Sequence, residues 1–154
     1  MIEIRALGAD DWALTRALRL AALVDSPEAF GGTYAESVQR SAEQWREWPR
    51  DGQVFAAVVD GEPVGMGCGW RPPGASGTHL IGMWIAPAAR GTGLAPRLID
   101  AVAQWARGNG SDALDLVVYE TNPRAYRAYL KYGFVNAGPN AQYPGGIDMR
   151  LPLT

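Results

Sequence analysis

The hydrophobic pattern of residues 79–119 constrains the fold more than any other feature of the chain. Residues 79–85 are a short apolar run with the length of a buried strand, and residues 114–118 are a second such run. Between them one apolar stripe recurs at helical spacing, formed by Leu94, Leu98, Ala101, Val102 and Trp105. The segment predicts a strand, a helix and a second strand parallel to the first, because the helix carries the chain back across the sheet.

The rest of the chain adds further strands and helices to this unit. Asp60-Gly61 separates the apolar runs 54–60 and 64–70 and is a strong hairpin signal. A helix that begins at Asp10 or Asp11 is predicted to stop before Pro27, with a loop through Gly31-Gly32. The other expected elements are strands at 2–4, 134–136 and 147–151, a short helix after the capping-box pair Ser41 and Gln44, and a helix from Asn122-Pro123 to Gly133.

This order of elements predicts an α/β (α+β) fold, in which helices pack on one mixed sheet. At 154 residues the chain has the length of one domain, residues 1–154. In the run 64–70, larger side chains alternate with Gly65, Gly67 and Gly69. We therefore expect one face of this strand to be bare, so that another group can approach it closely.

Composition excludes several classes of function. Fourteen basic and sixteen acidic residues give a net charge of −2, so no overall positive field attracts nucleic acid or an anionic membrane. A single cysteine, Cys68, and a single histidine, His79, argue against a disulfide and a metal centre. No apolar run approaches the ~18 residues of a membrane span, and the N-terminus lacks the layout of a signal peptide. We expect a cytoplasmic protein, and its arginine- and alanine-rich composition indicates a bacterial source.

The start of the central helix carries the motif with the most chemical information. The strand that ends at Ile85 is followed by Arg90-Gly-Thr-Gly-Leu-Ala95, which opens the helix. Unpaired helix-start amides, two glycines and flanking arginines together predict a phosphate site, although Gly91 and Gly93 would also serve a simple turn. ATP and NAD are disfavoured, because no P-loop sequence is present and Pro96 stands where the dinucleotide motif needs a glycine.

Two motifs in the right order resemble the GCN5-related N-acetyltransferase (GNAT) family. The first is Arg90-x-x-Gly93-x-Ala95, and the second is Asn122-x-x-Ala125-x-x-x-Tyr129-x-Lys131-x-Gly133-Phe134. The resemblance is sharp over residues 79–134. It implies that residues 1–154 form a single N-acetyltransferase domain with the GNAT-like acyl-CoA N-acyltransferase fold, in which two central strands splay apart and acetyl-CoA enters the gap.

The resemblance also implies which residues contact acetyl-CoA. The backbone of Met83, Trp84 and Ile85 would pair with the pantetheine arm. The pyrophosphate would be held by Arg90, Gly91, Thr92, Gly93, Leu94 and Ala95. Asn122 would contact the cofactor from the opposite strand, and Tyr126 would line the cofactor channel. No metal is implied.

Acetyl transfer to an amine needs an oxyanion donor, an acid and a base. A backbone amide near Trp84 would supply the donor, and Tyr129 matches the family's acid, although a packed aromatic is its other interpretation. The family often places a carboxylate on the strand of residues 83–85, but residues 78–89 contain none. His79 or Glu28 are the candidate bases, and an amine that arrives neutral needs no strong base.

The acceptor is expected to be a primary amine, on a small molecule or on a protein or peptide, which attacks acetyl-CoA directly in a ternary complex. Its identity does not follow from the sequence. Dimers are frequent among proteins of this kind, so a homodimer is the candidate assembly. Aromatic residues are the candidates for the acceptor pocket: Phe30, Tyr34, Trp45, Trp70 and Tyr143.

Two alternatives remain open at this level. The fold would also suit a non-catalytic sensor or partner module that binds acyl-CoA without turnover. Alternatively, Cys68 and His79 flank one predicted turn and would form a thiol nucleophile and its base in a covalent acyltransferase. The alternation of Cys68 with Val64 and Met66 favours a buried core thiol instead.

Overall fold

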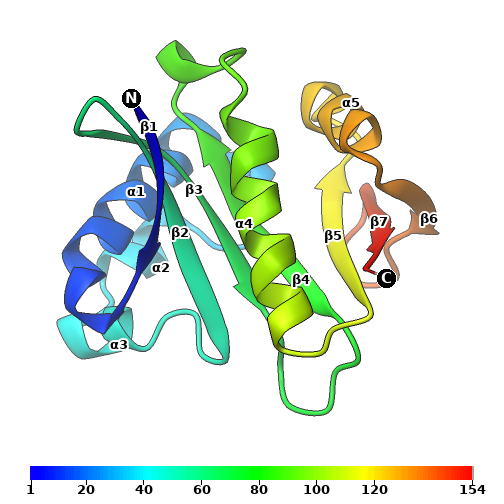
Figure 1. The fold of residues 1–154 in the computed structure, drawn as a ribbon, viewed down its shortest axis with the longest axis horizontal. Coiled ribbons are helices and arrows are strands. Elements are labelled where there is room, and N and C mark those ends of the chain that lie inside the picture. The colour runs from blue at the N-terminus through cyan, green and yellow to red at the C-terminus, as the bar shows by residue number, and fades with distance from the viewer. Residues whose placement is uncertain (154) are drawn as a thin grey trace.

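Seven strands form one sheet in the computed structural model, which describes residues 1–153. Their order across the sheet is β1-β2-β3-β4-β5-β7-β6 (Figure 1). The strands are β1 (Ile2–Leu7), β2 (Gly52–Val59), β3 (Glu62–Trp70), β4 (Thr78–Ile85), β5 (Ala113–Tyr119), β6 (Val135–Pro139) and β7 (Gly146–Pro152). The helices are α1 (Trp12–Asp25), α2 (Tyr34–Val38), α3 (Ala42–Arg46), α4 (Leu94–Gly108) and α5 (Pro123–Tyr132), with short 3-10 turns at Ala9–Asp11, Pro27–Ala29 and Pro87–Ala89.

The sheet is mixed, as the sequence predicts. Of the neighbouring strands in residues 1–153, only β4 and β5 run parallel, and α4 connects them. The β2–β3 hairpin turns at Asp60 and Gly61, both with positive φ (50° and 84°). Two positive φ angles define the turn that suits the natural twist of a hairpin, so this prediction is confirmed.

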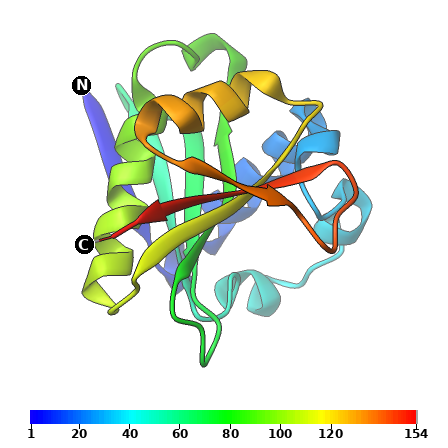
Figure 2. The same cartoon turned by 90° about the vertical axis from the view of Figure 1, so that its right-hand side faces the viewer.

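Helices cover both faces of the sheet. α4 lies along one face against β2, β3 and β4, and α1 lies on the other face with α2 and α3 beside it (Figures 1 and 2). Separate apolar clusters result, one containing Leu98 from α4 and another containing Leu18 and Ala22 from α1. The sheet thus divides the molecule into an α4 side and an α1 side.

The glycine face of β3 is what lets α4 approach closely. A Cβ added at Gly69 would lie 2.7 Å from the Trp105 ring, and one at Gly67 would lie 3.1 Å from the Met83 sulfur. Contacts that short exclude any larger side chain without a shift of the helix or of β4. The bare face expected from the alternating sequence is therefore confirmed, and α4 and β4 side chains fill it.

β4 and β5 pair at one end and separate at the other. β4 extends to Ile85 and β5 to Tyr119, but the only ladder pairs between them are Thr78 with Leu114 and His79 with Asp115. On its other side β4 stays paired with β3 as far as Ile85, with a bulge in which Gly82 has a φ of 61°. The backbone of β4 beyond His79 therefore has no partner on the β5 side, which confirms the expected splayed strands.

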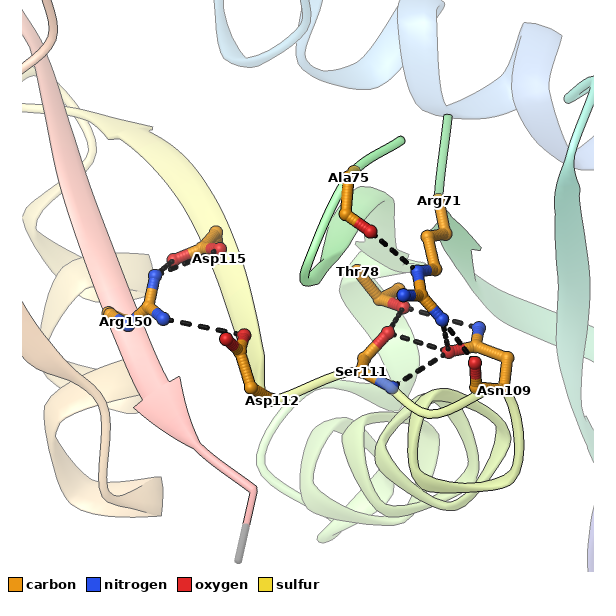
Figure 3. A network of polar contacts seen from close by, with 8 residues as sticks. All are labelled: Arg71, Ala75, Thr78, Asn109, Ser111, Asp112, Asp115 and Arg150. Atoms are coloured by element: carbon orange, nitrogen blue, oxygen red, sulfur yellow. Dashed lines mark hydrogen bonds and ion pairs between the residues drawn. The ribbon is translucent and has the colours of Figure 1, made fainter. Parts of the chain in front are cut away.

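Side-chain hydrogen bonds connect neighbouring segments at the end where β4 and β5 pair (Figure 3). The buried hydroxyls of Thr78 and Ser111 lie 2.6 Å apart, and Asn109 Oδ1 accepts from the Ser111 hydroxyl at 2.6 Å. The Arg71 guanidinium donates to the carbonyls of Ala75 and Asn109. We call this group, Arg71, Thr78, Asn109 and Ser111, the closed-end network. Every hydrogen bond in it is internal to the protein.

One helix departs from the prediction. The segment after Gly31-Gly32 was expected to be a loop, but residues 34–38 form α2. The Thr33 side chain caps this helix by accepting a hydrogen bond from the Glu36 amide at 3.2 Å. A Thr-x-x-Glu pattern is a helix-start signal, and it follows the glycine pair directly.

Within residues 1–153, no three His, Cys, Asp or Glu side chains are grouped closely enough to hold a metal ion. In the same residues no helix combines the length and the apolar character that crossing a bilayer requires.

Candidate active site

A cavity of about 650 Å³ opens where β4 and β5 separate. Its walls are the end of β4, the N-terminal turn of α4, one side of α5 and the segment that follows α1. Its lining residues are Ser26, Ala29, Phe30, Met83, Trp84, Ile85, Ala89, Arg90, Gly91, Gly93, Leu94, Ala95, Pro96, Ile99, Asn122, Arg124, Ala125, Ala128, Tyr129, Lys131 and Tyr132. The cavity thus joins the predicted phosphate site to the helix that carries Tyr129.

The N-terminus of α4 presents unpaired backbone donors to this cavity. Gly91 and Gly93 have φ angles of 79° and 83°, and a Cβ at either position would meet nothing within 4 Å. The amides of residues 91–93 find no acceptor in residues 1–153, and no side chain caps the helix, whose first turn contains no acidic residue. Positive φ explains why glycines stand here, and the free amides with the positive end of the helix dipole suit an anion.

Asp25 holds the neighbouring side chains in place. One of its carboxylate oxygens, Oδ2, accepts hydrogen bonds from Ser26 Oγ at 2.8 Å, from Trp84 Nε1 at 3.0 Å and from Arg90 Nη2 at 2.7 Å. Arg90 Nε also donates to the Ile85 carbonyl at 2.9 Å. The Trp84 and Ser26 hydrogen bonds lower the pKa of the Asp25 carboxyl, as does the Arg90 charge. Asp25 therefore ties the end of α1 to β4 and to the glycine turn.

α5 forms the opposite wall of the cavity. Asn122 caps it by accepting from the Ala125 amide at 3.3 Å, and Pro123 occupies its first turn. Gly133 ends it with a φ of 128°. Both terminal signals were predicted from the sequence, and together they fix the helix so that one face lies along the cavity.

Tyr129 lines the cavity from the middle of α5. Its ring packs edge-on against Phe134, with the centroids 5.6 Å apart. The hydroxyl has no hydrogen-bond partner in residues 1–153, and burial raises the pKa of the Tyr129 phenol. The group is therefore protonated at neutral pH and free to donate a hydrogen bond into the cavity.

Most of the residues assigned to acetyl-CoA by resemblance line this one cavity. They are Met83, Trp84, Ile85, Arg90, Gly91, Gly93, Leu94, Ala95 and Asn122. Thr92 and Tyr126 do not line it: the Thr92 hydroxyl donates to the Ala89 carbonyl, and the Tyr126 hydroxyl accepts from Asn136. These two side chains are occupied by turn and strand contacts within the fold.

Neither candidate base reaches the cavity wall. His79 stands at the paired end of β4, where its ring packs against Trp70 at 5.5 Å. The five residue steps from His79 to Trp84 span roughly 16 Å at the rise of a strand. Glu28 is an exposed residue of the Pro27–Ala29 turn, and only its neighbour Ala29 lines the cavity.

Of the aromatic residues predicted for the acceptor pocket, the structure brings only Phe30 to the cavity. Trp45 is a core residue, 1% exposed, whose ring packs against Trp48. Trp70 lies at the closed end beside His79, and Tyr34 and Tyr143 are exposed on α2 and on the loop before β7. The pattern of aromatic residues does not distinguish a core ring from a pocket ring, because both need a large apolar surface.

Three basic or phenolic residues line the cavity although no sequence argument pointed to them for this role. Arg124, Lys131 and Tyr132 come from the two ends of α5. Arg124 and Lys131 form no ion pair within residues 1–153. Tyr132 could have been found from the sequence, because it lies three residues after Tyr129 and so on the same helix face. Arg124 and Lys131 do not have that spacing from Tyr129, and their position inside the Asn122–Phe134 motif was the available signal.

Cys68 does not have the surroundings of a nucleophile. It is fully buried on β3, opposite Ile81, and burial raises the pKa of its thiol to about 12. A thiol with that pKa remains protonated at neutral pH. The structure therefore gives no support to a covalent mechanism through Cys68 and His79.

Comparison with known proteins gives a consistent result. A family model described as the Acetyltransferase (GNAT) family matches residues 20–134. A mycothiol acetyltransferase of Stackebrandtia nassauensis is 33% identical over 127 residues, a match that covers 80% of this chain and 40% of that protein. The chain thus spans about two fifths of the length of the curated relatives it matches.

Solved structures share the fold at low sequence identity. An acetyltransferase of the GNAT family from Streptococcus pneumoniae superposes with a TM-score of 0.81 and 18% identity, covering 100% of both chains. Spermidine N-acetyltransferase from Vibrio cholerae, in complex with CoA and spermine, gives a TM-score of 0.74 and 18% identity over 99% of this chain and 95% of that one.

Proposed function

The chain belongs to the acetyltransferase (GNAT) family, and on that premise we propose that it transfers the acetyl group of acetyl-CoA directly to an acceptor amine in a ternary complex. The observation that carries the proposal is the continuous cavity between the end of β4 and α5, beyond the point where β4 and β5 separate. It runs from the unpaired amides at the start of α4 to the free hydroxyl of Tyr129. An anion site and a hydrogen-bond donor on opposite walls of one cavity are what a thioester with a phosphorylated tail requires.

The residues present fit acetyl-CoA. The amides of residues 91–93 and the first turn of α4 would hold the pyrophosphate, with Arg124 and Lys131 facing them from α5. Arg90 is held by Asp25 and the Ile85 carbonyl, so its contribution is to fix the turn as well as to add charge. The β4 backbone from Met83 to Ile85, which has no β5 partner, offers hydrogen-bonding groups to the amide-rich pantetheine arm.

The bound thioester supplies an activated acyl carbon and a thiolate leaving group. The nitrogen lone pair of the acceptor forms the new C–N bond as the C–S bond breaks, and the surplus amine proton passes to solvent. A free amide on β4 near Trp84 would donate to the carbonyl oxygen as negative charge develops there.

Tyr129 is placed to stabilise the departing sulfur. Because burial raises its pKa above that of a thiol, which is about 8.5, complete proton transfer from the phenol is unfavourable. Its contribution is therefore chiefly a hydrogen bond to the sulfur, and the thiolate takes its proton from the medium.

The charge of the cavity wall bears on the acceptor. The lining contains Arg90, Arg124 and Lys131 and, within residues 1–153, no carboxylate and no imidazole. A positively charged wall lowers the pKa of an entering amine and so favours its neutral, nucleophilic form. We propose that deprotonation occurs before the amine enters, so that no protein side chain acts as a strong base and polycationic acceptors are disfavoured.

The decisive experiment combines a binding measurement with a turnover measurement. Calorimetry with acetyl-CoA should show one site per chain, and a thiol-release assay with an amine panel should show CoA release above background. Binding without release by any amine would favour the sensor alternative, and no binding would remove the proposal. Iodoacetamide treatment should leave activity intact, because the mechanism makes no use of Cys68.

Three further proposals concern the setting of the activity. We propose a cytoplasmic location, a bacterial source and a homodimer as the assembly. Light scattering with calorimetric titration of the same sample would give the number of chains per particle and per acetyl-CoA bound.

A further inference from the structure

Arg19 is a buried arginine with no polar partner. It projects from α1 toward the sheet and is 7% exposed. Its Nε is fully buried without a hydrogen bond, and neither of its Nη atoms forms a hydrogen bond or an ion pair within residues 1–153. The guanidinium instead lies over the rings of Phe30 and Trp48, at 4.8 Å and 5.4 Å from their centroids. The two rings offset part of the free-energy cost of burying this charge, but its N–H donors are left without an acceptor that a ligand could supply.

The surroundings of Arg19 are positive as well as apolar. The Arg40 guanidinium lies 4.8 Å from the Trp45 ring centroid and 5.4 Å from that of Trp48, the ring that Arg19 also contacts. Arg40 Nη1 is also buried without a hydrogen-bond partner. Burial lowers the pKa of Arg19, the nearby Cys68 thiol opposes that shift, and the Arg40 charge adds to it, whereas no carboxylate in residues 1–153 acts on it. Two arginines therefore share one tryptophan, and the only carboxylate within residues 1–153 that acts on either is Glu36, which acts on Arg40 and not on Arg19.

Arg19 lies directly behind one residue of the cavity wall and is not itself a lining residue. Phe30, which covers the guanidinium, also lines the cavity. A Cβ at Gly82, in the bulge of β4 directly before Met83, would lie 3.7 Å from Arg19 Nη1, and one at Gly32 would lie 3.4 Å from Nη2. The two glycines leave the guanidinium fork facing the bulge and the loop after α1, on the face of the sheet opposite α4.

We propose that Arg19 recognises a carboxylate carried by the acceptor, so that the acceptors of this protein are amino acids with a free carboxylate. The inference rests on the proposed function. A guanidinium presents two parallel N–H donors that match the two oxygens of a carboxylate, and Arg19 has both Nη atoms without partners. The carboxylate enters past Phe30, which leaves the amine on the cavity side of the ring, near β4.

The charge of the whole cavity supports the same class of acceptor. Arg124 and Lys131 line it without an ion pair, Arg90 is paired with Asp25, and Arg19 adds a cation behind the lining residue Phe30. An amine without a compensating carboxylate would bring only repulsion to this wall. An amino acid brings one group that pairs with Arg19 and one that becomes the nucleophile.

The test compares each of the twenty L-amino acids with its own carboxamide. The pair has nearly the same shape, but only the acid carries the negative charge. Calorimetric titration of the CoA-saturated protein should find at least one acid that binds about 10- to 100-fold more tightly than its amide. Arg19→Met should abolish that preference, Arg19→Lys should restore part of it, and Arg50→Met should leave it unchanged. Arg50 is a suitable control because its side chain is 79% exposed and far along the chain from α1.

A melting curve separates recognition from a structural role. Methionine has a similar length and carries no charge, so Arg19→Met should leave the melting temperature unchanged or raise it by a few degrees. A marked fall in melting temperature with the acid preference intact would overturn the proposal, as would equal binding of every acid and its amide.

The outcomes also separate this inference from the proposed function. Acetylation of acids and amides with equal efficiency would overturn the inference and leave N-acetyl transfer standing. Arg19-dependent binding of an acid without any CoA release would support the inference and remove the transfer reaction.

Discussion

The two ends of β4 satisfy their polar groups in opposite ways. At the closed end Thr78 and His79 pair with β5, and the closed-end network bonds its side chains to one another (Figure 3). At the open end the β4 backbone has no β5 partner, the amides of residues 91–93 have no acceptor, and the Tyr129 hydroxyl has no partner within residues 1–153. Polar groups that lack protein partners need a ligand or water. The contrast therefore locates the ligand at one end of a strand whose other end is purely structural.

A glycine pair gives the largest test of this contrast. Gly93 and Gly74 have nearly equal φ angles, 83° and 84°, and both have open space where a Cβ would stand. Gly93→Val should weaken acetyl-CoA binding about 100-fold, because the side chain would fill the space above the free amides. Gly74 lies in the Pro72–Ala75 turn at the closed end. The Gly74→Val variant should therefore lose a similar amount of stability from backbone strain but keep its affinity for acetyl-CoA. Calorimetry and urea unfolding of both variants measure the two effects, and equal affinity losses would contradict the assignment of the anion site.

The second effect concerns the free hydroxyl at the open end. Tyr129→Phe should lower turnover about tenfold or more while the dissociation constant of acetyl-CoA stays unchanged, because the hydrogen bond to sulfur forms only as the C–S bond breaks. Steady-state kinetics and calorimetry measure the two quantities. Tyr119→Phe, at a position that does not line the cavity, is the matched control. An unaltered rate in Tyr129→Phe would remove the residue from the reaction.

A smaller effect is expected at the closed end. Thr78→Val keeps the shape of the side chain and removes two hydrogen bonds, the one between Thr78 and Ser111 and the long one, 3.4 Å, that Asn109 Nδ2 donates to Thr78. The free energy of unfolding should fall by about 1 kcal/mol, since Ser111 keeps its bond to Asn109. Urea denaturation measures the loss. The affinity for acetyl-CoA should not change, and a parallel fall in affinity would mean that the two ends are coupled.

The smallest expected effect is a pH dependence of the unfolding free energy that comes from Asp25, whose carboxylate accepts three hydrogen bonds at the open end. Its folded-state pKa lies below the ordinary value, so its contribution to stability is present above about pH 4 and is lost as the pH falls through the lowered pKa. The difference in unfolding free energy between the wild type and Asp25→Asn should be constant from pH 7 to pH 5 and should shrink below pH 4. Urea titrations across this range measure it, and a difference that is the same at pH 3 and pH 7 would contradict the role.

Local signals explain why much of the fold was predictable. The Asp60-Gly61 turn, the caps at Asn122 and Gly133, and the stripe of α4 each act within a few residues, and the structure contains all of them. The Thr33 cap is a signal of the same kind, but the glycine pair directly before it favours a loop and led to the wrong prediction for residues 34–38. Boundaries were less accurate, as at β1, which extends to Leu7 because Leu7 pairs with Val54 of a distant strand.

The candidate site was predictable only where a motif carried it. The glycine turn and Tyr129 lie in contiguous motifs, and both line the cavity. Asp25, His79 and Trp45 could not be assigned in the same way, because their surroundings depend on contacts between distant segments. Asp25 meets Arg90 across 65 positions of sequence, and Trp45 is buried on α3, which packs against the distant helix α1. Arg19 looks like an ordinary surface arginine in the sequence, and only the packing of α1 on the sheet shows that it has no counterion.

The glycines of β3 have a consequence for how this protein tolerates change. Gly65 and Gly67 lie beneath Ile85 and Met83, and Gly69 lies beneath Trp105. An alanine at Gly65 would press on Ile85 and the Trp84 carbonyl, and one at Gly67 on the Met83 sulfur, so both would disturb the β4 wall of the binding chamber. An alanine at Gly69 would instead displace the Trp105 ring and with it the packing of α4 on the sheet. In a saturation mutagenesis library, these three positions should therefore be as intolerant of substitution as the residues that touch substrate, although none of them contacts it.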